Sequence, residues 1–240
     1  MKGMPRVAVL GGLPSEGTLA AGEFELIGEK RLGAPDRVMD EYQRTVVNTV
    51  RMVAPKAKFV FTAWQAQSGQ MSNSDLLRDI DALAAAKPDV LLITMGPLKG
   101  VAIKTMLAHV APDILIVNAA GNEGNVPLAF EGDPVLTQIA TVASIGSGGD
   151  ASPFTQRGAN VFWAPGEKIP VKVTDERLEL RDGTTYSAAL MAGIAARIMA
   201  EYPNLKPTQL LSTLRETAHS TSVDKPRVVN LTEALKRLQG

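Results

Sequence analysis

Short apolar runs alternate with longer helical patterns along most of this 240-residue chain, and this alternation limits the fold more than any other feature. Each run has the length of a buried strand and is apolar nearly throughout, instead of at every second position. The runs are RVAVL (6–10), KFVFTAW (58–64), DVLLITM (89–95), DILIVNAA (113–120) and IATVASI (139–145). Continuous apolar character is typical of parallel strands whose sheet is covered on both faces. The pattern therefore predicts one buried parallel sheet.

Between the predicted strands, apolar residues recur at the three- and four-residue spacing of amphipathic helices. In the segment 40–54, one stripe consists of Val46, Val47, Val50 and Val53. The segment 187–202 is apolar nearly all round, so we expect a buried central helix there. Further helices are predicted over 72–86, 99–111, 206–218 and 230–239. The strand–helix alternation favours a doubly wound α/β sheet with right-handed crossovers, while 146–184 is expected to hold loops and short edge strands.

Composition excludes several classes of function. Lysine plus arginine and aspartate plus glutamate number 25 each, so no charge excess points to nucleic acid or to an anionic membrane. Cysteine is absent, which excludes disulfides and thiolate zinc sites. The first apolar run is too short for a signal peptide, and no run reaches the roughly 18 residues of a membrane span. We expect a single domain over 1–240 that is soluble, cytoplasmic and without a cofactor.

Two segments carry groups suited to chemistry. In RDGTTYSAALMAGIAARIMAEYP (181–203), the turn Gly183-Thr184-Thr185 leads into the long apolar helix and would aim a hydroxyl at the helix N-terminus. In VNAAGNEGN (117–125), a buried strand ends in small residues before Asn122, whose side-chain amide can project as a hydrogen-bond donor. An asparagine that merely forms the turn between two glycines is the alternative.

A third segment, VLGGLPSEG, follows the first predicted strand, where a dinucleotide-binding fold has its phosphate loop. Its spacing differs from G-x-G-x-x-G. Pro14 and Glu16 stand where a pyrophosphate needs free amides and no negative charge. We expect a plain strand-to-loop turn there.

Together these segments resemble the subtilisin-type serine peptidases. VNAAGNEG is similar to the oxyanion-hole segment of that family, and the segment from Asp182 to Ala218 resembles its nucleophile segment with the central helix and the next helix. The stretch 139–169 with its WAPG, the strand after MVAPKA and the closing PRVVNLTEAL are also similar, in the same order along the chain. The resemblance implies a subtilisin-like three-layer α/β sandwich with a mostly parallel, doubly wound central sheet.

The resemblance fails at the catalytic triad. Family members carry an aspartate directly after the first strand, where this chain has Gly11. Counting back from Ala54-Pro55 puts Tyr42 closest to the position of the family histidine. The nucleophilic serine is replaced by Thr185, and Asn122 alone matches, at the oxyanion-hole position. The resemblance therefore implies a degenerate centre with no functional catalytic residue.

A hydroxyl at neutral pH is a weak nucleophile until a base removes its proton, and histidine supplies that base in the triad. Tyr42 is a poor substitute because a phenol with a pKa near 10 is protonated at pH 7. The two histidines, His109 and His219, are expected to be structural or surface residues, since the resemblance places neither beside Thr185. Loss of an acting triad costs about 10⁶ in kcat, which leaves negligible peptidase activity.

These replacements predict a catalytically inactive pseudopeptidase that binds a peptide, a partner subunit or an active peptidase as scaffold or regulator. ITMGPL (93–98) resembles the family's edge segment that takes up a peptide as an added strand, with Thr94, Met95 and Gly96 as its backbone partners. An edge capped by another loop is the alternative there.

Two further hypotheses stay open. One is a peptidase or hydrolase with a rewired site, in which Thr185 or Ser187 is the nucleophile and Asp40 or Glu41 is the base. The other is a structural domain of a larger assembly without a cleft ligand. No metal ion is expected, because 131–134 and 146–150 are ordinary turn sequences.

Overall fold

A seven-stranded parallel sheet forms the centre of the computed structural model, which describes residues 4–11, 13–14, 17–28, 37–62, 73–94, 101–124, 126, 128 and 138–240. The strand order is β2-β3-β1-β4-β5-β6-β7, and every neighbouring pair is parallel. The bounds are β1 Arg6–Leu10, β2 Phe24–Ile27, β3 Lys58–Thr62, β4 Val90–Ile93, β5 Leu115–Ala119, β6 Ile139–Ile145 and β7 Phe162–Pro165. All five predicted strands are confirmed, and β2 and β7 extend the sheet at its two edges.

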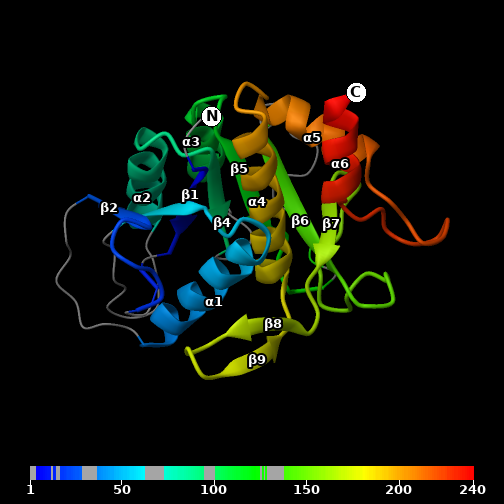
Figure 1. The fold of residues 1–240 in the computed structure, drawn as a ribbon, viewed down its shortest axis with the longest axis horizontal. Helices are drawn as coiled ribbons and strands as arrows, with labels where there is room; N and C mark the ends of the chain where they lie inside the picture. Colours follow the sequence, from blue (N-terminus) through cyan, green and yellow to red (C-terminus); the bar gives the residue numbers. More distant parts are fainter. Residues whose placement is uncertain are drawn as a thin grey trace.

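Helices cover both faces of this sheet, which makes three layers (Figure 1). One face packs against α1 (Arg37–Val53), α4 (Thr184–Glu201), α5 (Pro207–Glu216) and α6 (Leu231–Gln239). The other face packs against α2 (Asn73–Ala85) and α3 (Val101–His109). The chain order reverses beside β1, which pairs with both β3 and β4, as in doubly wound folds. The predicted α/β architecture is therefore confirmed.

Helix α4 is the buried central helix that its apolar composition predicts. It packs between α1 and the sheet, and most of its residues are buried. Gly193 lets the two helices approach closely, because a Cβ at this position would stand 2.7 Å from the carbonyl oxygen of Val50 in α1. This close packing fixes the last turn of α1 against the middle of α4.

A two-stranded antiparallel hairpin, β8 (Ile169–Lys172) and β9 (Leu178–Arg181), precedes α4. Figure 1 shows it projecting beside α1, with β9 as the outer strand. Ion pairs join the hairpin to α1 at two points, Arg44 with Asp175 and Glu41 with Arg181. These contacts position the segment that leads into Gly183 and the first turn of α4.

Within the described ranges, no helix combines the length and the apolar character that crossing a membrane requires.

Candidate active site

Thr185 lies in the first turn of α4 and is 7% exposed. The helix begins at Thr184, three residues before the start that the apolar pattern predicts. Gly183 precedes it with φ of 150°, a conformation that side-chain-bearing residues rarely adopt. The sharp entry places the hydroxyl of Thr185 at the positive end of a long helix.

Tyr42 of α1 meets Thr185 at this point. The two hydroxyl oxygens lie 3.1 Å apart, and the Tyr42 hydroxyl also lies 3.1 Å from the carbonyl oxygen of Thr94. A carbonyl can only accept, so Tyr42 donates its single proton to Thr94. The hydroxyl of Thr185 must then donate to Tyr42. The result is a directed chain in which the Thr185 proton points at a phenol oxygen that has already used its own proton.

The phenol of Tyr42 is not a base. Burial raises the pKa of Tyr42 above its ordinary value of 10.0, and the hydrogen bonds from Thr185 and to Thr94 offset this only in part. At neutral pH the side chain is therefore a neutral phenol. It orients the hydroxyl of Thr185 without being able to remove its proton.

Asn122, which follows β5, lies against the start of α4. Its side-chain oxygen accepts from the backbone N–H of Thr184 at 2.9 Å and from the Thr184 hydroxyl at 3.0 Å. Because the first of these donors is an N–H, the atom facing it is the amide oxygen. The Thr184 hydroxyl in turn accepts from the N–H of Gly121 at 3.1 Å. Asn122 is exposed, and its side-chain NH₂ makes no hydrogen bond within the described part of the chain.

The position directly after β1 holds Gly11, with φ of 121°. Gln43 of α1 packs against the end of this strand and donates from its side-chain nitrogen to the carbonyl of Leu10 at 3.3 Å. The Gln43 side chain is completely buried, and its amide oxygen has no hydrogen-bond partner. A neutral amide therefore stands beside Gly11.

The carboxylates of the rewired-site hypothesis lie in the first two turns of α1. Glu41 forms ion pairs with Arg181 at 3.1 Å and with Arg177 at 3.7 Å, both from the β8–β9 hairpin. These two ion pairs tie the Glu41 carboxylate to the hairpin. Asp40 lies one residue before it and is half-buried.

Ser187, the other nucleophile of that hypothesis, faces the protein interior. It is completely buried, and its hydroxyl has no hydrogen-bond partner. A Cβ on Gly166 would stand 2.2 Å from this hydroxyl and 2.4 Å from that of Ser144, so the two hydroxyls lie over the backbone of Gly166. A substrate has no access to Ser187 in this arrangement.

Of the three predicted peptide-binding residues, Thr94 is described and follows β4. Its carbonyl oxygen, which the peptide-binding hypothesis uses, accepts a hydrogen bond from Tyr42. Its hydroxyl is buried without a partner. Met95 and Gly96 lie outside the described residues, so their predicted role stays a prediction.

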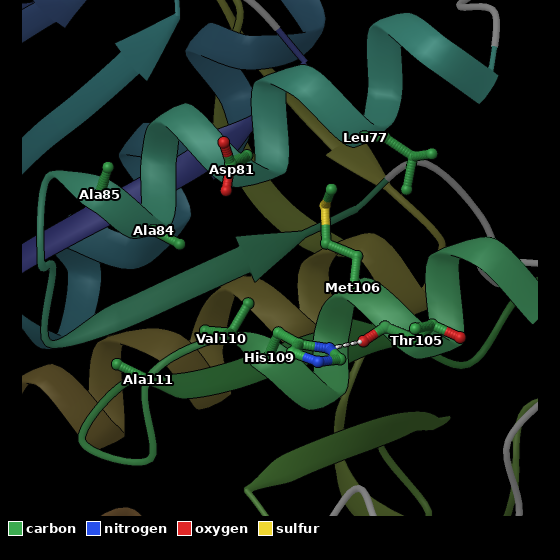
Figure 2. Close-up of a pocket in the computed structure, with 9 residues that line it drawn as sticks. All are labelled: Leu77, Asp81, Ala84, Ala85, Thr105, Met106, His109, Val110 and Ala111. Carbon is green, nitrogen blue, oxygen red and sulfur yellow. Dashed lines mark hydrogen bonds between the residues drawn. The ribbon is translucent and has the colours of Figure 1, made fainter.

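Both histidines are exposed and are engaged away from Thr185. Figure 2 shows His109 in a groove between α2 and α3, on the opposite face of the sheet from α4. Its Nδ1 lies 2.6 Å from the carbonyl oxygen of Thr105, so that nitrogen carries the proton and donates it. The groove has a volume of about 650 Å³ and is mostly apolar. His219 pairs with Val228 through backbone hydrogen bonds.

The described part of the chain contains no group of three or more His, Cys, Asp or Glu side chains that could hold a metal ion. Asn122 and the N-terminus of α4 together offer donors to an anionic oxygen.

Sequence comparison identifies relatives along most of the chain. The sequence profile of the subtilase family, Peptidase_S8, matches residues 17–240. A thermostable alkaline protease from Halalkalibacterium halodurans is 24% identical over 173 residues, which cover 69% of this chain and 46% of that protein. Subtilisin E from Bacillus subtilis is 26% identical over 171 residues, covering 69% and 45%. Mycosin-3 from Mycobacterium tuberculosis is 28% identical over 163 residues, covering 51% and 35%. The aligned regions thus span about half or less of these curated relatives.

Solved structures share the fold. The protease domain of PatA superimposes with a TM-score of 0.82 at 19% identity, covering 100% of this chain and 98% of that one. A cold-adapted subtilisin-like serine proteinase gives 0.72 at 20% identity, with coverage of 94% and 86%. The prenylagaramide maturation protease PagA gives 0.77 at 15% identity, with coverage of 98% and 93%. The three-layer frame is therefore that of subtilisin-like proteases.

Proposed function

Because the chain belongs to the subtilase family, we propose that it is a member that keeps the peptidase frame, has lost catalysis, and binds a peptide or protein as a scaffold or regulator. The observation that carries this proposal is the hydrogen-bond chain from Thr185 through Tyr42 to the carbonyl of Thr94. The hydroxyl at the nucleophile position meets a protonated phenol in place of a base.

Acyl transfer by a hydroxyl requires that its proton leave as the new bond forms. Tyr42 does not take that proton, because its raised pKa keeps the phenol neutral and a neutral phenol accepts a second proton only at extreme acidity. The position that orients the base in a triad is Gly11, beside the neutral amide of Gln43. Thr185 therefore remains an alcohol, further restricted by its own methyl group.

Asn122 and the start of α4 support the binding of a peptide. Asn122 is held by Thr184 through its side-chain oxygen, and its side-chain NH₂ can donate to a ligand. This donor and the start of α4 suit a carbonyl or carboxylate oxygen of a peptide. Relatives of the same fold are proteases by name, so an extended peptide is the ligand class that we propose.

One observation favours the alternative of an active hydrolase with a rewired site. Asn122 lies beside the start of α4, and in this alternative it is the oxyanion-hole donor, a role that contributes about 10²–10³ to kcat in active enzymes. This alternative uses Thr185 as nucleophile with a carboxylate such as Asp40 or Glu41 as base. It predicts turnover that depends on both the hydroxyl and the Asn122 amide.

Hydrolysis of a diverse set of fluorogenic peptides by the wild-type chain and by T185A and N122D tests the proposal. We expect equal, background-level rates for all three. Binding of the same peptides in a non-cleavable form, measured by fluorescence anisotropy, is expected to persist in T185A. Turnover lost in both T185A and N122D would establish the hydrolase instead, and absence of any peptide binding would reject the scaffold role.

A further inference from the structure

The hairpin strand β9 has an edge that no strand in the described part of the chain pairs with. The N–H of Val173 donates to the carbonyl of Arg177 at 2.9 Å, which makes these two residues a hydrogen-bonded pair. In an antiparallel ladder such pairs alternate with non-hydrogen-bonded ones. The residues opposite Lys172 and Pro170 are therefore non-hydrogen-bonded, and they are Leu178 and Leu180. Their backbone N–H and C=O groups point to the outer edge.

The side chains of the same two leucines are also exposed to solvent. Leu178 and Leu180 are each 65% exposed, on the face of the hairpin that points away from the protein. The opposite face is the packed one, where Ile169 and Val171 are buried with Tyr186. An edge with unpaired backbone groups and exposed leucines is a template for adding another strand.

This edge is held in place before any partner arrives. Arg44 and Asp175 join the hairpin turn to α1, and Glu41 joins α1 to Arg181 in β9. The side chain of Asn48 donates to the carbonyl of Lys172 at 3.4 Å. A strand fixed in this way loses little conformational freedom on pairing, which favours association.

We propose that β9 pairs antiparallel with β9 of a second copy of this chain, about a two-fold axis at Leu180, so that two hairpins form one four-stranded sheet. This inference goes beyond the proposed function and does not depend on the chemistry at Thr185. A two-fold contact uses the same surface on both copies and closes on itself.

Charge complementarity along β9 favours a second copy as the partner and favours one register of the pairing. Within one copy Glu179 already forms ion pairs with Arg177 and Arg181, and pairing across the two-fold axis extends this network. Positive and negative side chains alternate on one face as Arg177, Glu179 and Arg181. A two-fold axis at Glu179 would place the two Glu179 side chains opposite each other and Arg177 opposite Arg181 of the other copy. Both pairs carry like charges and repel. An axis at Leu180 places each Glu179 opposite Arg181 of the other copy and the two Leu180 side chains opposite each other. An axis at Leu178 would pair Glu179 with Arg177 and Leu180 with Glu176, and both of these partners lie outside β9. An axis at Leu180 keeps the pairs made by Glu179, Leu180 and Arg181 within the strand and leaves only Leu178 opposite a residue outside it, Asp182.

A concentration series of molar mass by light scattering tests the contact, because mass action makes dimerisation concentration-dependent. Over an about 100-fold range of wild-type concentration we expect the mass to rise from that of one chain toward that of two. L180K places a charge on the edge and is expected to remain at the mass of one chain. V223K, the matched control, changes an exposed valine outside the hairpin and should dimerise like the wild type.

Single cysteines test the register, since the chain has none of its own. Residues in a hydrogen-bonded antiparallel pair have Cα atoms about 5.5 Å apart, which suits a disulfide. Under mild oxidation we expect L180C to form a covalent dimer at least about ten times faster than L178C or V223C. A wild-type chain that stays monomeric throughout, or L180K that dimerises unchanged, overturns the contact. Preferential cross-linking of L178C overturns the register.

Discussion

The hydroxyl oxygens of Tyr42 and Thr185 lie 3.1 Å apart, although 143 positions separate the two residues in the sequence. The proton of Tyr42 is directed to the carbonyl of Thr94, so Thr185 is the donor between the two hydroxyls. This distance is one at which a nucleophile can donate its proton to a base, but Tyr42 is not a base. The structural and chemical predictions below follow from it.

Removal of the Tyr42 hydroxyl should destabilise the fold without changing peptide turnover. Y42F deletes two hydrogen bonds and leaves the carbonyl of Thr94 and the hydroxyl of Thr185 without this partner. We expect a loss of about 1–3 kcal/mol in the free energy of unfolding, measured by urea titration. Y202F is the matched control, since the Tyr202 hydroxyl makes no hydrogen bond within the described part of the chain and its loss should be near zero. Equal losses in both variants would contradict the assigned hydrogen bonds.

Stability should fall in alkaline solution because of buried tyrosines. Burial raises the pKa of Tyr42 above the value of about 10 that it has in the unfolded chain. The contribution of a group with a raised pKa is fully present below the unfolded pKa and is lost as pH rises through the folded pKa. The free energy of unfolding is therefore expected to decline above about pH 10. Urea titrations at successive pH values should show a shallower decline of the free energy of unfolding in Y42F. Burial also raises the pKa of Tyr186, so this residue accounts for part of the decline that persists in Y42F.

Asn122 should matter to the fold through its oxygen. N122A removes the acceptor that satisfies the first N–H of α4 and is expected to cost about 1 kcal/mol. N122D keeps the acceptor and adds a negative charge at the helix N-terminus, so its stability should equal or exceed that of the wild type. Thermal unfolding of both variants compares the two effects. A loss in N122D as large as that in N122A would show that the side-chain NH₂ contributes to folding.

Gly11 should resist replacement by any residue with a side chain. Its φ of 121° lies where other residues are strained, so G11A is expected to destabilise the chain by about 1–3 kcal/mol. The same strain applies to G11D, which would introduce the acid that the resemblance to the family predicts at this position. Denaturant titration of G11A is the measurement. A stability equal to that of the wild type would show that position 11 accommodates an ordinary backbone conformation, and with it an acid.

Five of the seven sheet strands were predictable because burial on both faces leaves a continuous apolar run. The edge strand β2 was missed, since Phe24 and Leu26 are 38% and 43% exposed and the acidic Glu25 lies between them. The alternation spans only residues 23–26, and the continuous apolar run of the buried strands is absent. Its pairing with β3 is decided by tertiary contacts.

The start of α4 was predicted three residues late for a related reason. Threonine has modest helix propensity, so Thr184 and Thr185 were read as a turn. In the structure the first N–H of the helix is satisfied by Asn122, a residue 62 positions earlier. A cap supplied from so far away leaves no local signal.

The resemblance to a known family singles out Gly11, Tyr42, Asn122 and Thr185, and the structure brings Tyr42 into contact with Thr185. The proton direction from Thr185 to Tyr42 to Thr94 was not predictable, because it depends on a backbone carbonyl. The packing of Gln43 against Leu10 was also hidden, since nothing in the sequence distinguishes this glutamine from a surface one. The ion pairs of Glu41 with two arginines of the hairpin were not predictable either, because they join residues far apart in the sequence.

The reactivity of the Thr185 hydroxyl tests the central claim most directly. The wild-type chain and T185A are incubated with a fluorophosphonate probe, with subtilisin E as the positive control, and the products are mapped by mass spectrometry of peptides. The account predicts no adduct on Thr185 under conditions that label subtilisin E completely. An adduct on Thr185 in the wild type that is absent from T185A would contradict it.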